Sequence, residues 1–430
     1  MRYFLAGAAV LLSAASAAGQ TMQDAVRQLY SFGTGCSQQI CLSVDGTHQL
    51  HFNPAAGGAE NGMTVFLQQA IGASASNIPI AAATSTGVLI QSGEGLPTRE
   101  TTSPGPIFAE RMQTLGKGGL YFAVNMTNFN YASLRGVPLS GLHTNITHQD
   151  VAPIGLGNPG FENDVISVNT TMHIDMLAAT PNFTYGVTDK IDVGLAVPLL
   201  YTSLTGTSQA QIQPFGPNDP HYFGDSTHRS LTATSAASQT AFGIGDIAMR
   251  VKVNLHAEKT WGFAVLADVR APTGDAKNFQ GAGVWGFEIL GIGSATFGPF
   301  SPHANLGYQG HDGTTQSDFA LATLGFDQRM NDLATLVVDF ISQWQVGSSP
   351  YQLPPNVTVT SFNTGGIPNT QRTIVPTNIP NERDNVVIAS VGAKFLQKNG
   401  VTWVANALIP IISGGVQPNA ALTFGVEYTR

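Results

Sequence analysis

The stretch Tyr185–Ser203, YGVTDKIDVGLAVPLLYTS, decides the fold because its side chains alternate in character from Ile191 onward. Successive side chains of a β-strand point to opposite faces. One face is large and apolar, and the other is small or polar except for Leu200. The apolar face holds Ile191, Val193, Leu195, Val197, Leu199 and Tyr201, and the opposite face holds Asp192, Gly194, Ala196, Pro198, Leu200 and Thr202. Such an apolar face packs against a protein core or against lipid.

The N-terminus and the composition indicate an exported protein with few charges. Residues 1–17 have the pattern of a secretory signal, with Arg2, an apolar stretch over Tyr3–Leu12 and the cleavage site Ala15-Ser16-Ala17. Charged residues make up 11% of the chain, against about 25% in ordinary soluble domains. No later stretch has roughly 18 uninterrupted apolar residues, so no membrane-spanning helix is predicted. The net charge of −8 disfavours nucleic acid as a partner.

Alternating segments repeat along the chain from about residue 118 onward. We count twelve of them, beginning near residues 118, 165, 190, 241, 261, 284, 301, 317, 333, 385, 401 and 420. Short connections such as VTDK and QKNG alternate with longer ones at about 132–164, 207–239, 271–283, 310–316, 346–384 and 411–419. An even strand number with alternately short and long connections is typical of outer-membrane barrels.

The hydrocarbon core of a membrane favours closure of such strands into a barrel, because every backbone N–H and C=O group in it needs a partner within the protein. Aromatic residues near the turns or the chain end fit an interfacial girdle: Trp261, Phe297, Phe300, Trp403 and Tyr428. The sequence therefore predicts an all-β fold, a closed antiparallel transmembrane barrel of about twelve strands over residues 118–430, in a bacterial outer membrane. The face from Ile191 to Tyr201 would then contact lipid. An exported soluble β-sandwich is the alternative that alternation by itself leaves open.

Residues 18–117 differ from the barrel region and are predicted to form either a plug inside the barrel or a periplasmic segment. Residues 22–32 and 63–76 have helical spacing of apolar side chains, and a small hairpin is expected around Asp45-Gly46. Cys36 and Cys41 are expected to form a local disulfide, since an exported chain meets an oxidising compartment. No metal-ligand spacing accompanies these cysteines, and no metal site is predicted.

Charged residues share the polar face of the predicted strands. The candidate lumen-lining residues are Asp246, Arg250, Lys252, Asp268, Arg270, Glu288, Asp339 and Lys394, with Glu427 as a further member. One strand register would place Arg250 opposite Asp268, and another would place Asp246 opposite Arg270. These residues either select the solutes that pass or form a salt-bridged network that only packs the interior.

Four segments, in this order, resemble a known family: YGVTDKIDVGLAVPLL, GIGDIAMRVKVNL, RAPTGDAKNFQGAG and SPHANLGYQG. They are similar to the phenol meta-degradation-pathway outer-membrane family, over about residues 185–310. SNIPI and GPIFAERMQTLGKG are similar to the lead-in of related proteins. The resemblance implies an outer-membrane barrel that passes hydrophobic or aromatic solutes. It implies no catalytic or binding positions.

Enzyme chemistry is not predicted. His173 and Asp175 share one strand face, which we expect to point inward, but no serine is placed to complete a catalytic set. Pro272–Asp275 is interpreted as turn chemistry rather than a ligand loop. No cofactor is expected. The expected partners are outer-membrane lipid, a small-molecule solute and the barrel-assembly machinery acting through the C-terminal strand. The expected function is a channel for small solutes, and the alternative is a closed structural or binding barrel with a filled lumen.

Overall fold

The computed structural model describes residues 20–35, 40–44, 67–77, 80, 82, 88–90, 99–101, 104–146, 165–213, 221–350, 353, 356–362, 368–397 and 400–430. No helix in this described part of the chain is long and apolar enough to cross a membrane. The predicted signal peptide lies outside these residues. Cys36 also lies outside them, so the Cys36–Cys41 disulfide stays a prediction.

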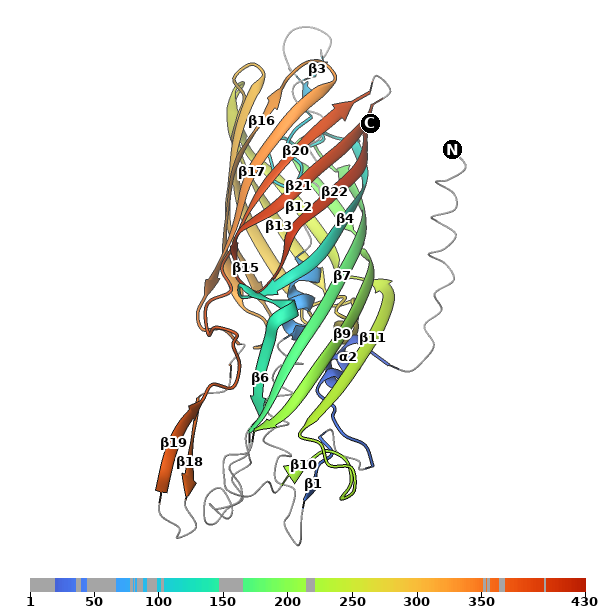
Figure 1. The fold of residues 1–430 in the computed structure, drawn as a ribbon. Helices are drawn as coiled ribbons and strands as arrows, with labels where there is room; N and C mark the ends of the chain where they lie inside the picture. Colours follow the sequence, from blue (N-terminus) through green and yellow to red (C-terminus); the bar gives the residue numbers. More distant parts are fainter. Residues whose placement is uncertain are drawn as a thin grey trace, which may run out of the picture.

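Twelve antiparallel strands form a closed barrel (Figure 1), as the sequence predicts. The ring closes through β4 and β7, which pair from Leu120 with Tyr185 to Tyr131 with Ile174. β8 and β9 form one barrel strand interrupted at Val197-Pro198, and β12 and β11 form the next. In order around the wall, the strands are β4 (Leu120–Leu134), β7 (Val165–Gly186), β8 (Ile191–Ala196) with β9 (Leu199–Gln213), β12 (Ile247–Ala257) with β11 (Thr232–Ile244), β13 (Trp261–Ala271), β14 (Gly286–Ala295), β15 (Phe300–His311), β16 (Asp318–Arg329), β17 (Ala334–Val346), β20 (Val386–Leu396), β21 (Val401–Ser413) and β22 (Val416–Thr429).

Smaller elements gather mainly at the end of the barrel away from the C-terminus (Figure 1). They are α2 (Met22–Leu29), β1 (Ser43–Val44), β5 (Val137–Pro138), η1 (Leu139–Gly141), β6 (Leu142–Ile146), β10 (His221–Tyr222), η2 (Ala276–Asn278), β18 (Val357–Phe362) and β19 (Pro368–Ile374). The short hairpin of β2 (Val88–Ile90) and β3 (Arg99–Thr101) lies at the opposite end. The short turns lie at the end that holds the C-terminus, which identifies that end as periplasmic.

The alternating stretch from Ile191 lies as predicted in the wall. Val193 and Leu195 expose 38% and 43% of their surface on the outside, whereas Asp192 is 1% exposed. Large apolar side chains are similarly exposed around the outer surface of the other barrel strands. An apolar exterior on a closed hydrogen-bonded ring is the arrangement that hydrocarbon requires, so this is an outer-membrane barrel.

Three strands run far beyond the ring toward the extracellular side. β7, β9 and β11 form an extended sheet with β6, and β9 pairs with β11 from Leu199 with Ile244 to Gln211 with Thr232. Within the predicted loop over 207–239, residues 207–213 and 232–239 are therefore strand. The predicted loop over 411–419 is also wrong, because β21 continues to Ser413 and β22 begins at Val416.

Two local predictions for the N-terminal part have different outcomes. The predicted helix over 22–32 is present as α2, and residues 67–76 form a second helix within the predicted 63–76. β1 pairs with β10, and the other half of the hairpin expected around Asp45-Gly46 lies outside the described residues. α2 begins where Thr21 caps it, since the Thr21 hydroxyl accepts a bond from the Asp24 N–H and the Asp24 carboxylate accepts one from the Thr21 N–H.

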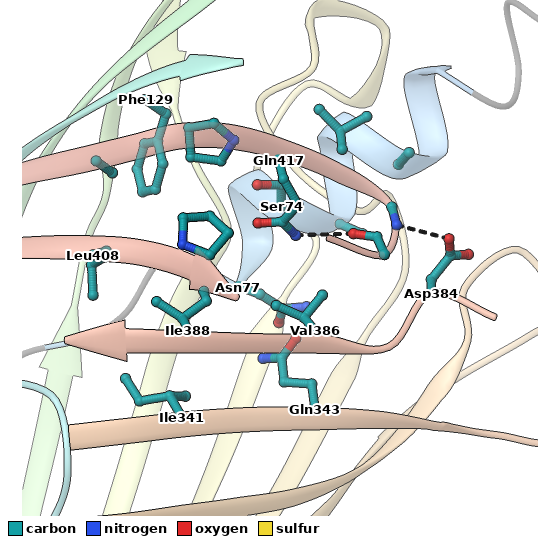
Figure 2. Close-up of a pocket in the computed structure, with 18 of the residues that line it drawn as sticks. Ser74, Asn77, Phe129, Ile341, Gln343, Asp384, Val386, Ile388, Leu408 and Gln417 are labelled. Atoms are coloured by element: carbon teal, nitrogen blue, oxygen red, sulfur yellow. Dashed lines mark hydrogen bonds between the residues drawn. The ribbon is translucent and has the colours of Figure 1, made fainter. Parts of the chain in front are cut away.

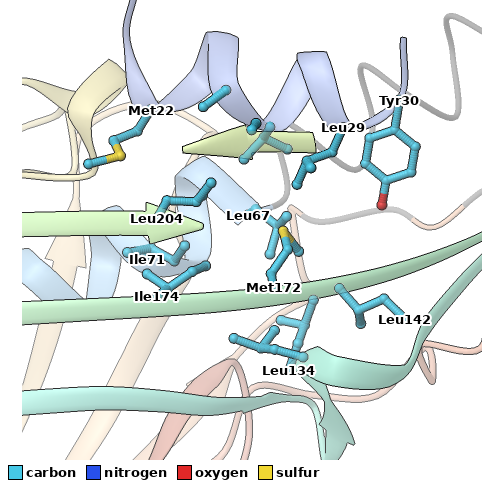
Figure 3. Packing of buried hydrophobic residues seen from close by; sticks show 14 of the residues in the cluster. Met22, Leu29, Tyr30, Leu67, Ile71, Leu134, Leu142, Met172, Ile174 and Leu204 are labelled. Carbon is cyan, nitrogen blue, oxygen red and sulfur yellow. The ribbon is translucent and has the colours of Figure 1, made fainter. Parts of the chain in front are cut away.

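The main hydrophobic core lies inside the extended sheet, where the two helices meet β7 and β9 (Figure 3). Met22 and Leu29 of α2 face Leu67 and Ile71 of the second helix, and strand residues such as Met172 complete the packing. His173 and Asp175 point the other way. The prediction that these two face inward is wrong, because Met172 and its alternate neighbours occupy the inner face of β7.

Candidate functional site

An apolar cavity of about 130 Å³ lies inside the barrel between the helix over 67–76 and the wall strands β16, β17, β20, β21, β22 and β4 (Figure 2). The helix contributes Ala70, Ala73 and Ser74, and Asn77 follows at its end. The large apolar side chains that line the cavity are Phe129, Phe319, Ile341, Val386, Ile388, Leu408 and Val416. These side chains come from the inner positions of the barrel strands, which alternate with the lipid-facing ones.

The polar groups in the cavity lining are mostly uncharged. Ser74 and Asn77 come from the helical segment, and Gln343 and Gln417 come from the wall. The Ser74 hydroxyl is 2.9 Å from the Tyr131 hydroxyl. A largely apolar pocket with a few fixed polar groups is the usual form of a small-molecule site.

The helix over 67–76 is held in place by polar contacts at its C-terminal end. Arg270 donates from Nη1 to the Ser76 carbonyl and to Asn77 Oδ1, the latter at 3.2 Å. Gln309 donates from Nε2 to Asn77 Oδ1 at 2.6 Å. A cationic group at a helix C-terminus pairs with carbonyls that have no partner within the helix. Arg270 thereby positions one wall of the cavity.

Asp384 is the only charged residue among the described residues that line the cavity. Its carboxylate accepts two bonds from Arg135, at 2.8 Å from Nε to Oδ1 and at 2.9 Å from Nη2 to Oδ2. It also accepts a bond from the Gly415 N–H at 2.9 Å, in the turn between β21 and β22 (Figure 2). The charge is thus neutralised by a partner, and an apolar solute does not meet a free carboxylate here.

On the periplasmic side of the barrel, the segment over 104–119 contacts inward-facing residues of the wall. Glu110 lies 3.1 Å from Arg250 and 3.1 Å from Lys252, measured between carboxylate oxygens and the cationic nitrogens. Arg250 is also 3.2 Å from Asp268, and Arg270 is 3.3 Å from the same carboxylate. These five residues form one buried cluster, which we call the Glu110 cluster.

A second buried cluster surrounds Arg111. Arg111 Nε lies 3.4 Å from Asp327, and His303 lies 2.7 Å from Asp339 and 3.8 Å from Asp327. The side chains of these four residues are at most 1% exposed. Nearby in the same segment, Ile107 packs against Val337 and Val404 of the wall. The segment therefore makes both charged and apolar contacts with the inner surface of the barrel.

The predicted lumen-lining residues separate into groups. Arg250, Lys252, Asp268 and Arg270 belong to the Glu110 cluster, and the register pairs Arg250 with Asp268. Glu288 is opposite Asp268 in the ladder from β13 to β14. Asp339 belongs to the Arg111 cluster, and Lys394 pairs with Glu427 at 3.0 Å. Asp246 instead accepts bonds from the Gly274 and Ala282 N–H groups, at 3.0 and 2.8 Å, and braces the loop that begins PTGD.

None of the predicted lumen-lining residues borders the cavity, and sequence reasoning missed the residues that do. It also assigned no role to Glu110, Arg111, Arg135 or Asp384. One signal was available for the first two: adjacent opposite charges in IFAERMQ stand out in a chain with 11% charged residues. The Arg135–Asp384 pair has no such signal, because its members are 249 positions apart.

Comparison with known proteins supports the barrel fold and the family that the sequence resembles. Residues 157–409 match the family described as "Putative MetA-pathway of phenol degradation". The chain belongs to this family. No sequence relative among the curated proteins matches at a significant level.

Solved structures that match this chain include three proteins of low sequence identity. An outer membrane channel from Pseudomonas putida F1 is 11% identical, with a TM-score of 0.39, over 74% of this chain and 98% of that one. A Pseudomonas aeruginosa FadL homologue is 11% identical, with a TM-score of 0.31, over 73% and 89% of the two chains. The Ralstonia pickettii toluene transporter TbuX is 12% identical, with a TM-score of 0.26, over 73% and 90%.

Proposed function

We propose that this family member is an outer-membrane channel for small hydrophobic solutes, with single aromatic rings as the favoured class. The apolar cavity beside the helix over 67–76 carries the proposal. Its volume of about 130 Å³ is close to that of an engineered cavity of about 150 Å³ that binds benzene. The ion-paired state of Asp384, the one charged group in the described lining, suits an uncharged ligand.

Residues 18–117 act in this proposal as a plug. Contacts of Glu110 with Arg250 and Lys252, and of Arg111 with Asp327, support it because they tie the segment to the inner wall. The periplasmic location considered from the sequence would leave these charges without their partners. Residues 1–17 would direct export and be removed, and β22 would present the chain to the barrel-assembly machinery.

Uptake of labelled toluene by diderm cells that express the protein tests the function. Cells with the wild-type protein should take up toluene several-fold faster than cells without it. Ala73→Leu adds bulk to the cavity lining and should remove most of the gain, whereas Ala320→Leu adds the same group to the lipid-facing surface and should keep it. No gain with the wild type, or equal gains with both variants, would refute the proposal.

A closed barrel that serves as a structural or binding component is the second candidate. The buried Glu110 and Arg111 clusters favour it, because both fill the lumen with paired charges. Planar-bilayer recordings of the full chain test whether the lumen is open to ions. A water-filled pore would conduct ions, whereas a permanently filled lumen would conduct none. Toluene uptake is then measured separately.

A further inference from the structure

Four ionisable side chains of the Arg111 cluster meet at the periplasmic side of the lumen. The His303 ring joins two carboxylates of the wall, with Nε2 2.7 Å from Asp339 and Nδ1 3.8 Å from Asp327. Arg111, from the segment over 104–119, lies 3.4 Å from Asp327. The wall therefore supplies two carboxylates and one imidazole to the cluster, and the segment supplies one guanidinium.

The contact between Arg111 and Asp327 is a charge contact without a hydrogen bond. Among the described residues, neither oxygen of the Asp327 carboxylate accepts a hydrogen bond, and Arg111 Nε and Nη2 donate none. Both side chains are at most 1% exposed. In the Glu110 cluster, by contrast, Lys252 donates a hydrogen bond to the Glu110 carboxylate at 3.1 Å. A buried ion pair without hydrogen bonds recovers little of the cost of removing its charges from water. The Arg111 contact is therefore the weaker of the two charged attachments of the segment.

Gly325 of β16 makes room for the contact between His303 and Asp339. It lies opposite both residues in their ladders. A Cβ atom at this position would collide with Asp339 Oδ1 and would lie 2.8 Å from His303 Nε2. Glycine weakens the interior of a strand, because it loses more conformational freedom on folding than any other residue. The wall is thus built to hold the imidazole against a carboxylate.

The groups that face the cluster from the neighbouring elements are uncharged or already paired. The residues opposite its members in the ladders are Ser294 and Gly325 beside His303, Val337 beside Asp327, and Ser390 beside Asp339. Lys394 of β20 acts on Asp339 through its charge, and it forms an ion pair with Glu427 at 3.0 Å. In the segment, Glu110 is engaged by two cations of β12. The charge balance of the cluster thus depends on its own four members.

The number of protons that balances the cluster depends on Arg111. Asp327 and Asp339 contribute two negative charges, and His303 contributes a positive charge only when its ring is protonated. With Arg111 docked, one proton on the ring makes the cluster neutral. With Arg111 withdrawn, neutrality needs two protons, one on the ring and one on the pair of carboxylates. The docked and withdrawn states therefore differ by one bound proton.

A proton and the Arg111 guanidinium thus compete for the same two carboxylates. The withdrawn state binds more protons, and a state that binds more protons is favoured as pH falls. A difference of one proton changes the docking equilibrium by about tenfold per pH unit. Acid therefore favours withdrawal of the segment, and neutral pH favours docking.

We propose that the Arg111 cluster is a proton-operated latch, in which acid detaches the segment over 104–119 from the wall and opens the periplasmic side of the lumen. Asp327, Asp339 and His303 form the proton-binding site of the wall, and Arg111 is the group that the proton displaces. This inference rests on the proposed function, because it adds the regulation of the proposed plug.

Hydrogen exchange of the segment tests the latch. The Glu110 N–H donates to Asn305 Oδ1 at 2.8 Å, and the Met112 N–H donates to Ser294 Oγ at 3.1 Å. These two amides are protected by the wall only while the segment is docked. Their protection factors, corrected for the intrinsic effect of pH on exchange, are measured on the full chain in micelles at pH 7 and pH 5. Heat-modifiable gel migration establishes that each barrel is folded at both pH values.

Two segment variants identify the group that responds to acid. Wild-type protection factors should fall at least tenfold from pH 7 to pH 5. Arg111→Met should be less protected at pH 7 and should lose most of the pH dependence. Glu110→Gln is the matched control, because it removes the neighbouring charge of the segment and should keep the tenfold fall. A flat wild-type profile, or an acid response that Arg111→Met retains, would overturn the latch.

A wall variant tests the latch with the segment still docked. His303→Gln together with Asp339→Asn leaves Arg111 and Asp327 as a balanced pair that needs no proton. Its protection factors at pH 7 and pH 5 should agree within twofold. A tenfold fall in this variant would show that the wall site does not sense acid and would overturn the proposal.

Toluene uptake at the two pH values separates this inference from the proposed function. Uptake per folded barrel should be several-fold faster at pH 5 than at pH 7 with the wild type, and equal at both with the wall variant. Release of the segment with unchanged uptake would overturn the opening of the lumen. A wild type that takes up no toluene at either pH would refute the proposed function, and the exchange data would still decide whether the latch exists.

Discussion

Arg135 and Asp384, 249 residues apart in the sequence, form a buried two-point ion pair at the rim of the apolar cavity. Their side chains are 1% and 7% exposed. Arg135 has a φ of 46°, a left-handed conformation that few side chains adopt, and the pair offsets that cost. The pair joins the β4–β5 turn, the chain before β20 and the β21–β22 turn, which come from distant parts of the sequence.

Asp384→Asn should destabilise the protein. The substitution leaves the Arg135 guanidinium buried without its counter-charge, which typically costs about 3–5 kcal/mol. It also weakens the contact that holds Gly415. Urea unfolding in micelles measures the loss of stability. Asp332→Asn, at an exposed site in the β16–β17 turn, is the control and should unfold as the wild type does. An unchanged unfolding midpoint in Asp384→Asn would contradict the stabilising role of the ion pair.

Glu110→Gln should loosen the segment over 104–119. The substitution leaves Arg250 and Lys252 with a neutral partner, and Arg250 alone retains Asp268. We expect faster proteolysis of the segment and more frequent current steps in planar bilayers. Glu258→Gln is the control, because Glu258 is exposed near a periplasmic turn. Unchanged proteolysis together with unchanged currents would argue against a plug held by this carboxylate.

Phe129→Ala should change the size of solute that the cavity accepts. Phe129 is 7% exposed and lines the cavity, so its removal enlarges the space at a cost of about 3–5 kcal/mol in stability. Competition between toluene and naphthalene in an uptake assay should shift toward the two-ring molecule. Phe424→Ala removes the same group from the lipid-facing side, where Phe424 is 62% exposed, and should leave the preference unchanged.

The cap of α2 should make this helix sensitive to acid. Bonds from the backbone and side chain of Thr21 lower the pKa of Asp24. A carboxyl with a lowered folded-state pKa stabilises the helix above its unfolded value, and this contribution is lost as pH falls through the folded value. The protection factors of residues 22–29 in hydrogen exchange, which are corrected for the intrinsic effect of pH on amide exchange, should therefore fall between neutral and strongly acidic pH. Asp24→Asn should exchange faster at neutral pH and lose most of that dependence, and an unaltered pH profile in this variant would contradict the assignment.

Loss of the Thr21 hydroxyl should weaken the same helix at neutral pH. Thr21→Ala removes the acceptor for the Asp24 N–H, a change that costs about 1 kcal/mol at a helix N-terminus. The measurement is again hydrogen exchange over residues 22–29. Thr21→Ser keeps the hydroxyl and should behave as the wild type, so equal exchange in both variants would show that the cap does not stabilise α2.

Sequence reasoning found the barrel because the environment acts on each strand locally. Lipid on one side and a packed interior on the other impose a period of two, which is visible from Ile191 to Thr202 without knowledge of any partner. Strands that do not have lipid on one side and a packed interior on the other lack this alternation. β9 and β11 beyond the ring are rich in Ser, Thr, Gln and Ala, and the sequence suggested a loop there.

The candidate site was less predictable than the wall. Alternation placed Arg250 and Asp268 on the same face of the predicted strands, but the register and the partner Glu110 depend on the closed ring. The cavity was not predicted at all. Its lining joins the helix over 67–76 to strands more than 200 positions later, and residues 411–419, which contribute to it, were expected to form a loop.

The sequence by itself determined the periodic pattern, and with it the strand number, the lipid-facing side chains and the membrane in which the barrel lies. The tertiary structure decided which charges pair and where the apolar cavity lies. The physical reason is the distance along the chain between the residues that produce each feature. Alternation is a property of neighbours along one strand, whereas a cavity and an ion pair such as Arg135–Asp384 exist only after distant segments have been brought together.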